Sequence, residues 1–134
     1  MGFLWFLGQG MLAGSPEARL ESGWLLSQLY FNTVGSLALL GDAGALEHLL
    51  STAKRQDAGS LRGDAATQLG RVGGEEVVRT LATVLRDPDR DVRWSAIAAL
   101  GATRDPEALR ILESAWGTAT GYEWKRIEAA LKAT

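Results

Sequence analysis

The sequence predicts an all-α fold, a right-handed α-α superhelix (solenoid) of helical hairpins, and two observations support this prediction. When the chain of 134 residues is compared with itself, Val92 to Leu112 matches Leu61 to Leu81 at a shift of 31 residues, without a gap. Within each copy, apolar residues recur at intervals of three and four, the spacing that places them on one face of an α-helix. A fixed period in this range is typical of solenoids, in which each repeat packs on its neighbours.

Residues that begin and end helices agree with hairpins. Asp105-Pro106 and Asp87-Pro88 each offer an N-cap aspartate followed by a proline at the first helical position. A glycine follows the last apolar residue of each first helix, where a left-handed residue would close the helix. These glycines are Gly41, Gly70 and Gly101.

The pattern predicts a single domain that spans residues 1–134 and consists of hairpins between two caps. The hairpins are expected at residues 32–55, 60–86 and 89–116. N-terminal cap helices are expected at 1–31 and a C-terminal cap helix at 120–133.

Composition narrows the possible functions. With 46% hydrophobic and 22% charged residues the chain can bury a core, and its formal charge of −2 makes nucleic acid an unlikely partner. The absence of cysteine excludes disulfides, thiolate nucleophiles and cysteine-bound metals, and fits a cytoplasmic protein. With His48 as the single histidine, we expect no metal site, no cofactor and no catalytic residue.

The first 14 residues, MGFLWFLGQGMLAG, are apolar. They are shorter than the ~20 apolar residues that cross a bilayer, and they lack the basic start of a secretory signal. We expect no transmembrane segment. The segment is interpreted as a packed terminal helix or as an interface with another chain, which includes self-association; a membrane-surface anchor and a cryptic signal are the alternatives.

One stretch carries a family resemblance. Residues 91–101, DVRWSAIAALG, followed by residues 104–109, RDPEAL, resemble the short HEAT-like repeat that is also seen in phycobilisome lyases. Residues 61–86 match this repeat more loosely, and residues 33–52 only through their leucines and the Leu-Gly closure. The resemblance implies a HEAT-like solenoid, a platform that scaffolds and regulators use, and it says little about which partner is bound.

In such a stack we expect the second helices of the hairpins to line the concave face, so that residues 31 apart form rows along it. The basic row is His48, Arg79 and Arg110. The hydroxyl row is Thr52, Thr83 and Ser114, and the acidic row contains Glu76 and Glu107. The basic row suits an acidic peptide or a phosphate-bearing ligand. The alternative is a solvated face on which each arginine pairs with the glutamate three residues earlier.

Further arginines and tryptophans have expected structural roles. In this repeat type, Arg62 and Arg93 are interpreted as clamps on an acidic residue in a turn, with Asp64 and Asp91 as possible partners. Trp116 matches a core leucine of the previous copy and is expected to be buried. Trp94 and Trp124, near the starts of first helices, are expected to be partly exposed, where they fill space between repeats or stack on a partner.

Taken together, these features favour a non-enzymatic protein-protein interaction or scaffold module that binds a protein or peptide through its concave face. Two alternatives stay open on resemblance alone: a chromophore-lyase-like activity, and nucleic-acid binding like that of HEAT-like DNA glycosylases.

Overall fold

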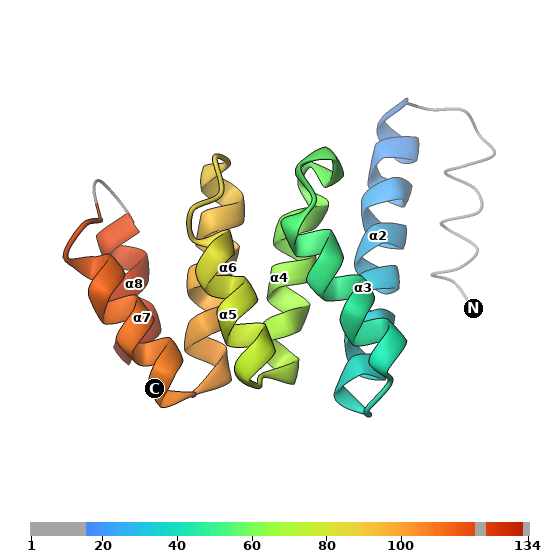
Figure 1. Cartoon of the computed structure of the whole chain (residues 1–134). Helices are drawn as coiled ribbons and strands as arrows, with labels where there is room; N and C mark the ends of the chain where they lie inside the picture. The colour runs from blue at the N-terminus through green and yellow to red at the C-terminus, as the bar shows by residue number, and fades with distance from the viewer. Residues whose placement is uncertain (1–15, 120–122, 133–134) are drawn as a thin grey trace. The chain divides into compact units, whose positions relative to one another are not determined.

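The structure is a computed structural model that describes residues 16–119 and 123–132, and it is helical throughout apart from turns (Figure 1). In chain order the elements are α2 (Pro16–Leu39), α3 (Ala43–Lys54), the short 3-10 helix η1 (Gln56–Ala58), α4 (Leu61–Val72), α5 (Glu75–Val84), α6 (Arg90–Thr103), α7 (Pro106–Trp116) and α8 (Glu123–Lys132). The described residues contain no strand, and the prediction of an all-α solenoid is confirmed.

The chain divides into two units, residues 1–33 and residues 34–134. Helix α2 continues without a break through residues 31 and 32, where the sequence predicts the boundary between the cap and the first hairpin. The stretch from Phe31 to Val34 contains neither glycine nor proline, so nothing in it ends a helix. The apolar segment 1–14 lies outside the described residues.

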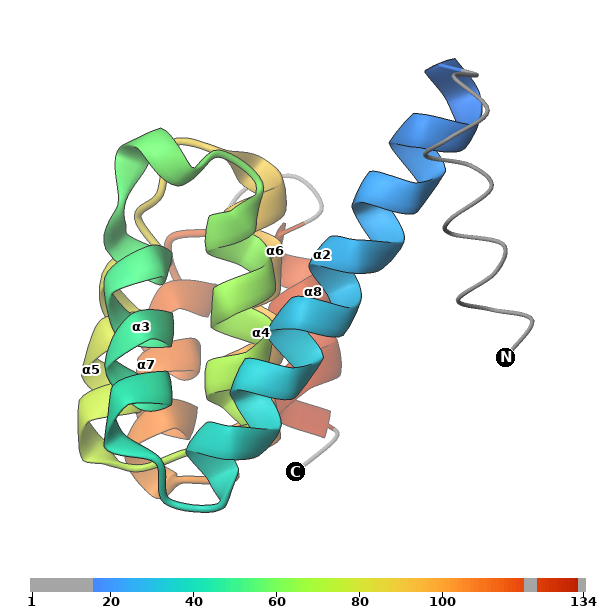
Figure 2. The ribbon, with the colours of Figure 1, turned by 90° about the vertical axis from the view of Figure 1, so that its right-hand side faces the viewer.

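The second unit contains the repeats, and its helices form two layers (Figure 2). We call the layer of α4, α6 and α8 the first-helix layer, and the layer of α3, α5 and α7 the second-helix layer. Large apolar side chains from both layers are fully buried, each less than 2% exposed. These are Leu49, Leu69, Leu81, Leu100 and Leu112. Burying one leucine contributes about 1.5–3 kcal/mol, so the predicted apolar periodicity accounts for the core.

The predicted cap at Asp105 is confirmed, because its side chain accepts a hydrogen bond from the Glu107 amide at 2.8 Å. The prediction for Asp87 is wrong. The cap of α6 is Asp89, whose carboxylate accepts from the Asp91 amide at 2.8 Å. Asp87 lies buried in the loop before it, where Arg62 binds it.

The glycines differ in their roles. Gly41 closes α2 as predicted: its φ is +103°, its amide donates to the Ala38 carbonyl, and the Asp42 amide donates to the Leu37 carbonyl, which is the Schellman arrangement. For Gly70 and Gly101 the prediction is wrong, since both lie buried inside helices α4 and α6.

Gly70 and Gly101 instead permit close approach of neighbouring first helices. A Cβ atom added at Gly70 would lie 2.8 Å from the Cα of Ala99 in α6. One added at Gly101 would lie 2.9 Å from the Cβ of Ala130 in α8. The two contacts are related by the 31-residue shift, so each junction between first helices is built on the same glycine-alanine contact.

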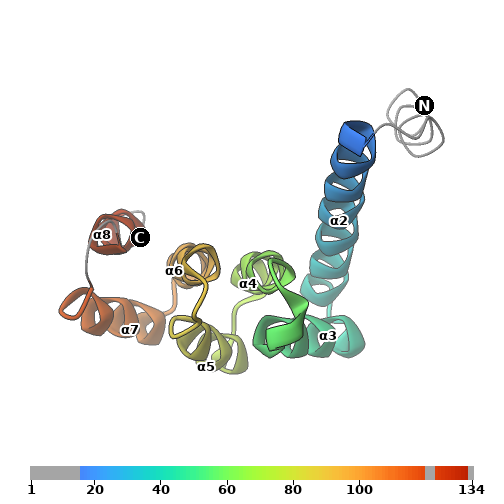
Figure 3. The ribbon, with the colours of Figure 1, turned by 90° about the horizontal axis from the view of Figure 1, so that it is seen from above.

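This close packing sets the curvature of the second unit. Viewed from above (Figure 3), the two layers bend, and the first-helix layer lies on the inner side of the bend. The predicted placement of the second helices on the concave face is therefore wrong. First helices touch through glycine and alanine, whereas a hollow lined by Leu85 and Ile111 lies between the second helices α5 and α7, and a stack bends toward its more closely spaced layer.

Candidate functional site

The three predicted rows lie on the second-helix layer, on the outer side of the bend. His48 of α3, Arg79 of α5 and Arg110 of α7 are all exposed. Arg110 forms an ion pair with Glu107, three residues earlier on α7, which is the solvated-face alternative. Since both side chains are more than half exposed, this pair contributes little to stability.

The hydroxyl row is largely engaged with its own helices. Thr52 is buried, and its hydroxyl donates to the His48 carbonyl at 2.7 Å. The hydroxyl of Thr83 donates to the Arg79 carbonyl at 3.3 Å. Hydrogen bonds of this kind run back along the helix and leave fewer hydroxyl groups for a partner.

Shallow hollows do occur on this layer. Glu107, Arg110 and Ser114 line one of about 460 Å³ between α5 and α7. Glu76 lines another of about 350 Å³, between α3 and α5. The structure therefore brings three residues of the predicted rows together, Glu107, Arg110 and Ser114. The charge of Arg110 is already neutralised by Glu107 of the same helix.

The two predicted arginine clamps are present, but their partners differ from those proposed. Arg62 holds Asp87 with two hydrogen bonds, Nε to Oδ2 at 2.7 Å and Nη2 to Oδ1 at 3.0 Å. Arg93 donates from Nε to Glu123 Oε1 at 2.8 Å. These carboxylates lie 25 residues after Arg62 and 30 residues after Arg93. The predicted partners, Asp64 and Asp91, do not form these hydrogen bonds.

Each clamp also binds a loop backbone. Arg62 donates to the Gln56 carbonyl and Arg93 to the Asp87 carbonyl, both at 2.9 Å and both six residues back. Burial tends to raise the pKa of Asp87, but hydrogen bonds from Arg62 and from the Asp89 amide outweigh it and hold that pKa below its usual value. The clamps therefore fix the loops that join successive repeats.

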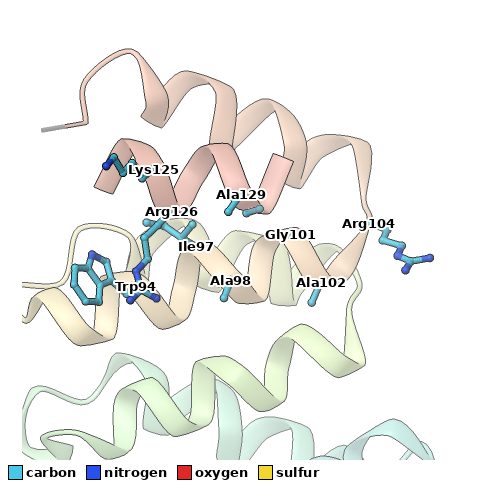
Figure 4. Close-up of a pocket in the computed structure, with 10 residues that line it drawn as sticks. Trp94, Ile97, Ala98, Gly101, Ala102, Arg104, Lys125, Arg126 and Ala129 are labelled. Carbon is cyan, nitrogen blue, oxygen red and sulfur yellow. The ribbon is translucent and has the colours of Figure 1, made fainter. Parts of the chain in front are cut away.

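A further hollow lies between α6 and α8, and Figure 4 shows its lining. We call it the α6–α8 groove; its volume is about 720 Å³. Ala98, Ala102 and Ala129 are exposed on its floor, above the buried Ile97. Its other lining residues are Trp94, Gly101, Arg104, Lys125, Arg126 and Ala130. No carboxylate, hydroxyl or imidazole occurs among the lining residues that the structure describes, so the groove combines an apolar floor with basic edges.

Substitutions within the repeat explain why this junction opens. At the α4–α6 junction, Gly63 lies against Ser95: an added Cβ would be 3.0 Å from the Ser95 hydroxyl oxygen. A shift of 31 residues turns this pair into Trp94 and Arg126. Two large side chains thus occupy the α6–α8 junction where two small ones meet at the α4–α6 junction.

On the floor of the groove, by contrast, larger side chains of α4 are replaced by smaller ones in α6. Thr67 and Arg71 of α4 correspond to Ala98 and Ala102 of α6. Arg71 reaches back toward α2, donating to Gln68 at 2.6 Å and to Ser36 of α2 at 3.2 Å. Ala102, at the equivalent position of α6, has no such long side chain, and it is exposed at the groove.

Trp94 stacks with two arginines at one end of the groove. The guanidinium carbon of Arg126 lies 3.9 Å from the indole ring centroid and that of Arg90 lies 4.7 Å from it. Figure 4 shows Arg126 reaching from α8 toward Trp94 of α6. The indole Nε1 of Trp94 is buried and has no hydrogen-bond acceptor among the described residues. The partly exposed positions predicted for Trp94 and Trp124 are confirmed, whereas Trp116, expected to be buried, is 47% exposed at the end of α7.

The groove was not predicted, because the contact surface was expected on the other layer. The repeat itself carries one signal of it: a shift of 31 residues puts Trp94 in register with Gly63 and Arg126 in register with Ser95, which is a large change of side-chain size at a repeated junction.

No helix in residues 16–119 and 123–132 is long and apolar enough to cross a membrane. No group of three or more histidine or acidic side chains suited to a metal ion occurs in that part either.

Comparison with known proteins addresses the family. The family model for HEAT repeats matches residues 46–132, which include α4 to α8 and most of α3. A search of curated proteins finds no match. The family match and the repeated helical hairpins agree, and the chain belongs to the HEAT-repeat family.

Proposed function

We propose that this HEAT-repeat chain is a non-enzymatic protein-interaction module and that its partner binds in the α6–α8 groove. The observation that carries the proposal is the groove itself, a hollow of about 720 Å³ with exposed alanines on its floor. Among the described residues its lining has no serine, threonine, cysteine, histidine or carboxylate side chain, so its chemistry suits recognition. Grooves between packed helices are common binding sites.

The rows on the second-helix layer are a second candidate for the same function. The hollow at Glu107, Arg110 and Ser114 supports this candidate. We rank it lower because it is smaller and because Arg110 already has an anionic partner. Membership of the lyase-type subgroup stays a prediction, since the family match concerns HEAT repeats in general.

Site-specific photo-crosslinking tests the proposal and ranks the two surfaces. A photoreactive phenylalanine analogue is placed at Ala98 on the groove floor, at Thr67, which holds the same register position on α4, and at Ser114 on the outer layer. All three positions are exposed, so folding is expected to be kept. We expect a discrete protein adduct from Ala98 in cells of the source organism, and none from Thr67.

An adduct from Ser114 alone would move the binding site to the second-helix layer. No protein adduct from any of the three positions would contradict the interaction-module proposal.

A further inference from the structure

The α6–α8 groove is basic, whereas the chain as a whole is nearly balanced in charge. The sequence holds 14 basic and 16 acidic residues, a nearly even balance. The described part of the groove lining contains Arg104, Lys125 and Arg126 and no acidic residue, and Arg90 is stacked on Trp94 beside it. A basic hollow in a slightly acidic protein calls for an anionic partner.

Three of these basic residues have no carboxylate partner in the part of the chain that the structure describes. Within the described residues, none of Arg90, Arg104 and Arg126 forms an ion pair. This distinguishes them from Arg62, Arg93 and Arg110, each of which is bound to a carboxylate.

Trp94 also prepares two of them for binding. Stacking places the guanidinium carbons of Arg90 and Arg126 at 4.7 Å and 3.9 Å from the centroid of the same indole ring. Two positive charges stacked on one side chain raise the local attraction for an anion. Since stacking restricts both side chains beforehand, less conformational entropy is lost when a carboxylate binds them.

The floor excludes a purely ionic ligand. Ala98, Ala102 and Ala129 present methyl groups, and the volume of about 720 Å³ far exceeds that of one small anion. Such a floor accepts bulky apolar side chains and brings a bound backbone close to α6 and α8. Nucleic acid is disfavoured, because a phosphate backbone is bound by rows of basic residues on a polar surface.

From these observations we infer that the α6–α8 groove binds an acidic peptide segment of the partner protein, with bulky apolar side chains on the alanine floor and carboxylates at Arg90 and Arg126. The inference rests on the proposed function and names the chemistry of its partner. Carboxylates pair with arginine through two parallel hydrogen bonds, so the stacked arginines provide the specificity.

Selection from an unbiased library tests the inference. The full chain is used to select from displayed random 12-residue peptides, and the selected peptides are synthesised and titrated by fluorescence anisotropy. We expect the selected peptides to be rich in Asp and Glu and to carry at least one large apolar residue. Arg126→Glu is expected to weaken their binding by about tenfold or more, and Arg126→Gln by less.

Matched variants separate the groove from the rest of the surface. Ala98→Gln covers the floor without changing charge and is expected to weaken binding, whereas Thr67→Gln at the same register position of α4 is expected to leave it unchanged. A peptide whose acidic residues are replaced by lysine should bind Arg90→Glu/Arg126→Glu better than it binds the unmodified chain. Circular dichroism checks that each variant is folded.

Selected peptides without an acidic bias, or binding that Arg126→Glu leaves intact, would overturn the inference. So would a 20-base-pair DNA duplex that displaces the peptides at equal concentration, because it would assign the groove to nucleic acid. If Ala98 still yields a protein adduct while the selection gives neutral or basic peptides, the interaction module stands and only its acidic partner is refuted.

Discussion

The α4–α6 and α6–α8 junctions are two copies of one interface, and they differ in the side chains beside their shared contact. Both contain the glycine-alanine contact, Gly70 with Ala99 and Gly101 with Ala130. At the first junction a glycine meets a serine and the interface is closed. At the second, Trp94 and Arg126 take those positions and a groove opens beside them.

This difference shows how a repeat protein separates stability from recognition. The contacts that hold helices together recur every 31 residues, while the residues beside them vary. The clamps follow the same division: the Arg62–Asp87 pair is almost fully buried, with side chains 6% and 3% exposed. In the Arg93–Glu123 pair, next to the groove, about a quarter of each side chain is exposed. We expect the closed junction to carry more of the stability.

The largest expected effect comes from breaking the buried clamp. Asp87→Ala leaves the guanidinium of Arg62 buried with no carboxylate, and removing one partner of a buried pair costs about 3–5 kcal/mol. The free energy of unfolding measured in urea checks this value. Asp57→Ala serves as the control, because its pair with Arg55 is exposed, and it is expected to leave stability unchanged. Equal losses in the two variants would contradict the assigned role of the buried pair.

Acid should weaken the same clamp. The pKa of Asp87 is lower in the folded chain than in the unfolded one, so its contribution is complete above the unfolded value of about 3.9 and is lost as pH falls through the lower folded value. We expect the unfolding free energy to fall below about pH 4. Urea titrations at several pH values should give a flatter acid limb for Asp87→Asn, and the same slope in both proteins would show that Asp87 does not cause it.

The clamp beside the groove should matter less. Glu123→Ala removes the carboxylate, but Arg93 keeps its hydrogen bonds to the Asp87 and Pro88 carbonyls and is partly hydrated. We expect a loss of about 1–2 kcal/mol in the same urea experiment. A loss as large as that of Asp87→Ala would mean that the two junctions are equally important for stability.

Adding one methyl group to each junction sharpens the comparison further. Gly70→Ala places its Cβ against the backbone of Ala99 in α6, a helix that α4, α5, α7 and α8 hold in place, and a net loss of about 1 kcal/mol is expected after the gain in helix propensity. Gly101→Ala presses on α8, which packs chiefly against α6 and α7, so fewer neighbours resist a small displacement; its change should stay within about 0.5 kcal/mol. Thermal unfolding followed by circular dichroism measures both, and the opposite ranking would refute the difference in packing.

The smallest effect is expected at the stacked arginines. Arg126→Ala removes one guanidinium from Trp94, an interaction worth about 0.5–1 kcal/mol at an exposed position. The emission of Trp94 should also change, which Trp94→Phe in the same background verifies. A destabilisation well beyond this range would make Arg126 a structural residue and weaken its assignment to recognition.

The sequence predicted the repeated helices, but few of the contacts between them. The 31-residue period gave the helical hairpins, and the arginine at a fixed register position gave the clamps. Their partners were not predictable, because Asp87 reaches Arg62 only after an intervening helix brings the loop back. A glycine that follows a leucine looks the same in sequence whether it ends a helix, as Gly41 does, or receives a neighbouring helix, as Gly70 does.

The groove and the direction of curvature depend on spacing between helices, which no single helix determines. That Gly63 faces Ser95, and hence that Trp94 faces Arg126, follows only from the crossing of α4 with α6 and of α6 with α8.

The groove also required no change in the length of the repeat. Gly63 and Trp94 hold the same register position, as do Ser95 and Arg126, so the two junctions differ by substitutions without insertion or deletion. We expect that Gly63→Trp and Ser95→Arg, combined with Thr67→Ala and Arg71→Ala, would create a second groove one repeat earlier. Because each repeat packs on its neighbours, recognition in this chain can be edited one junction at a time.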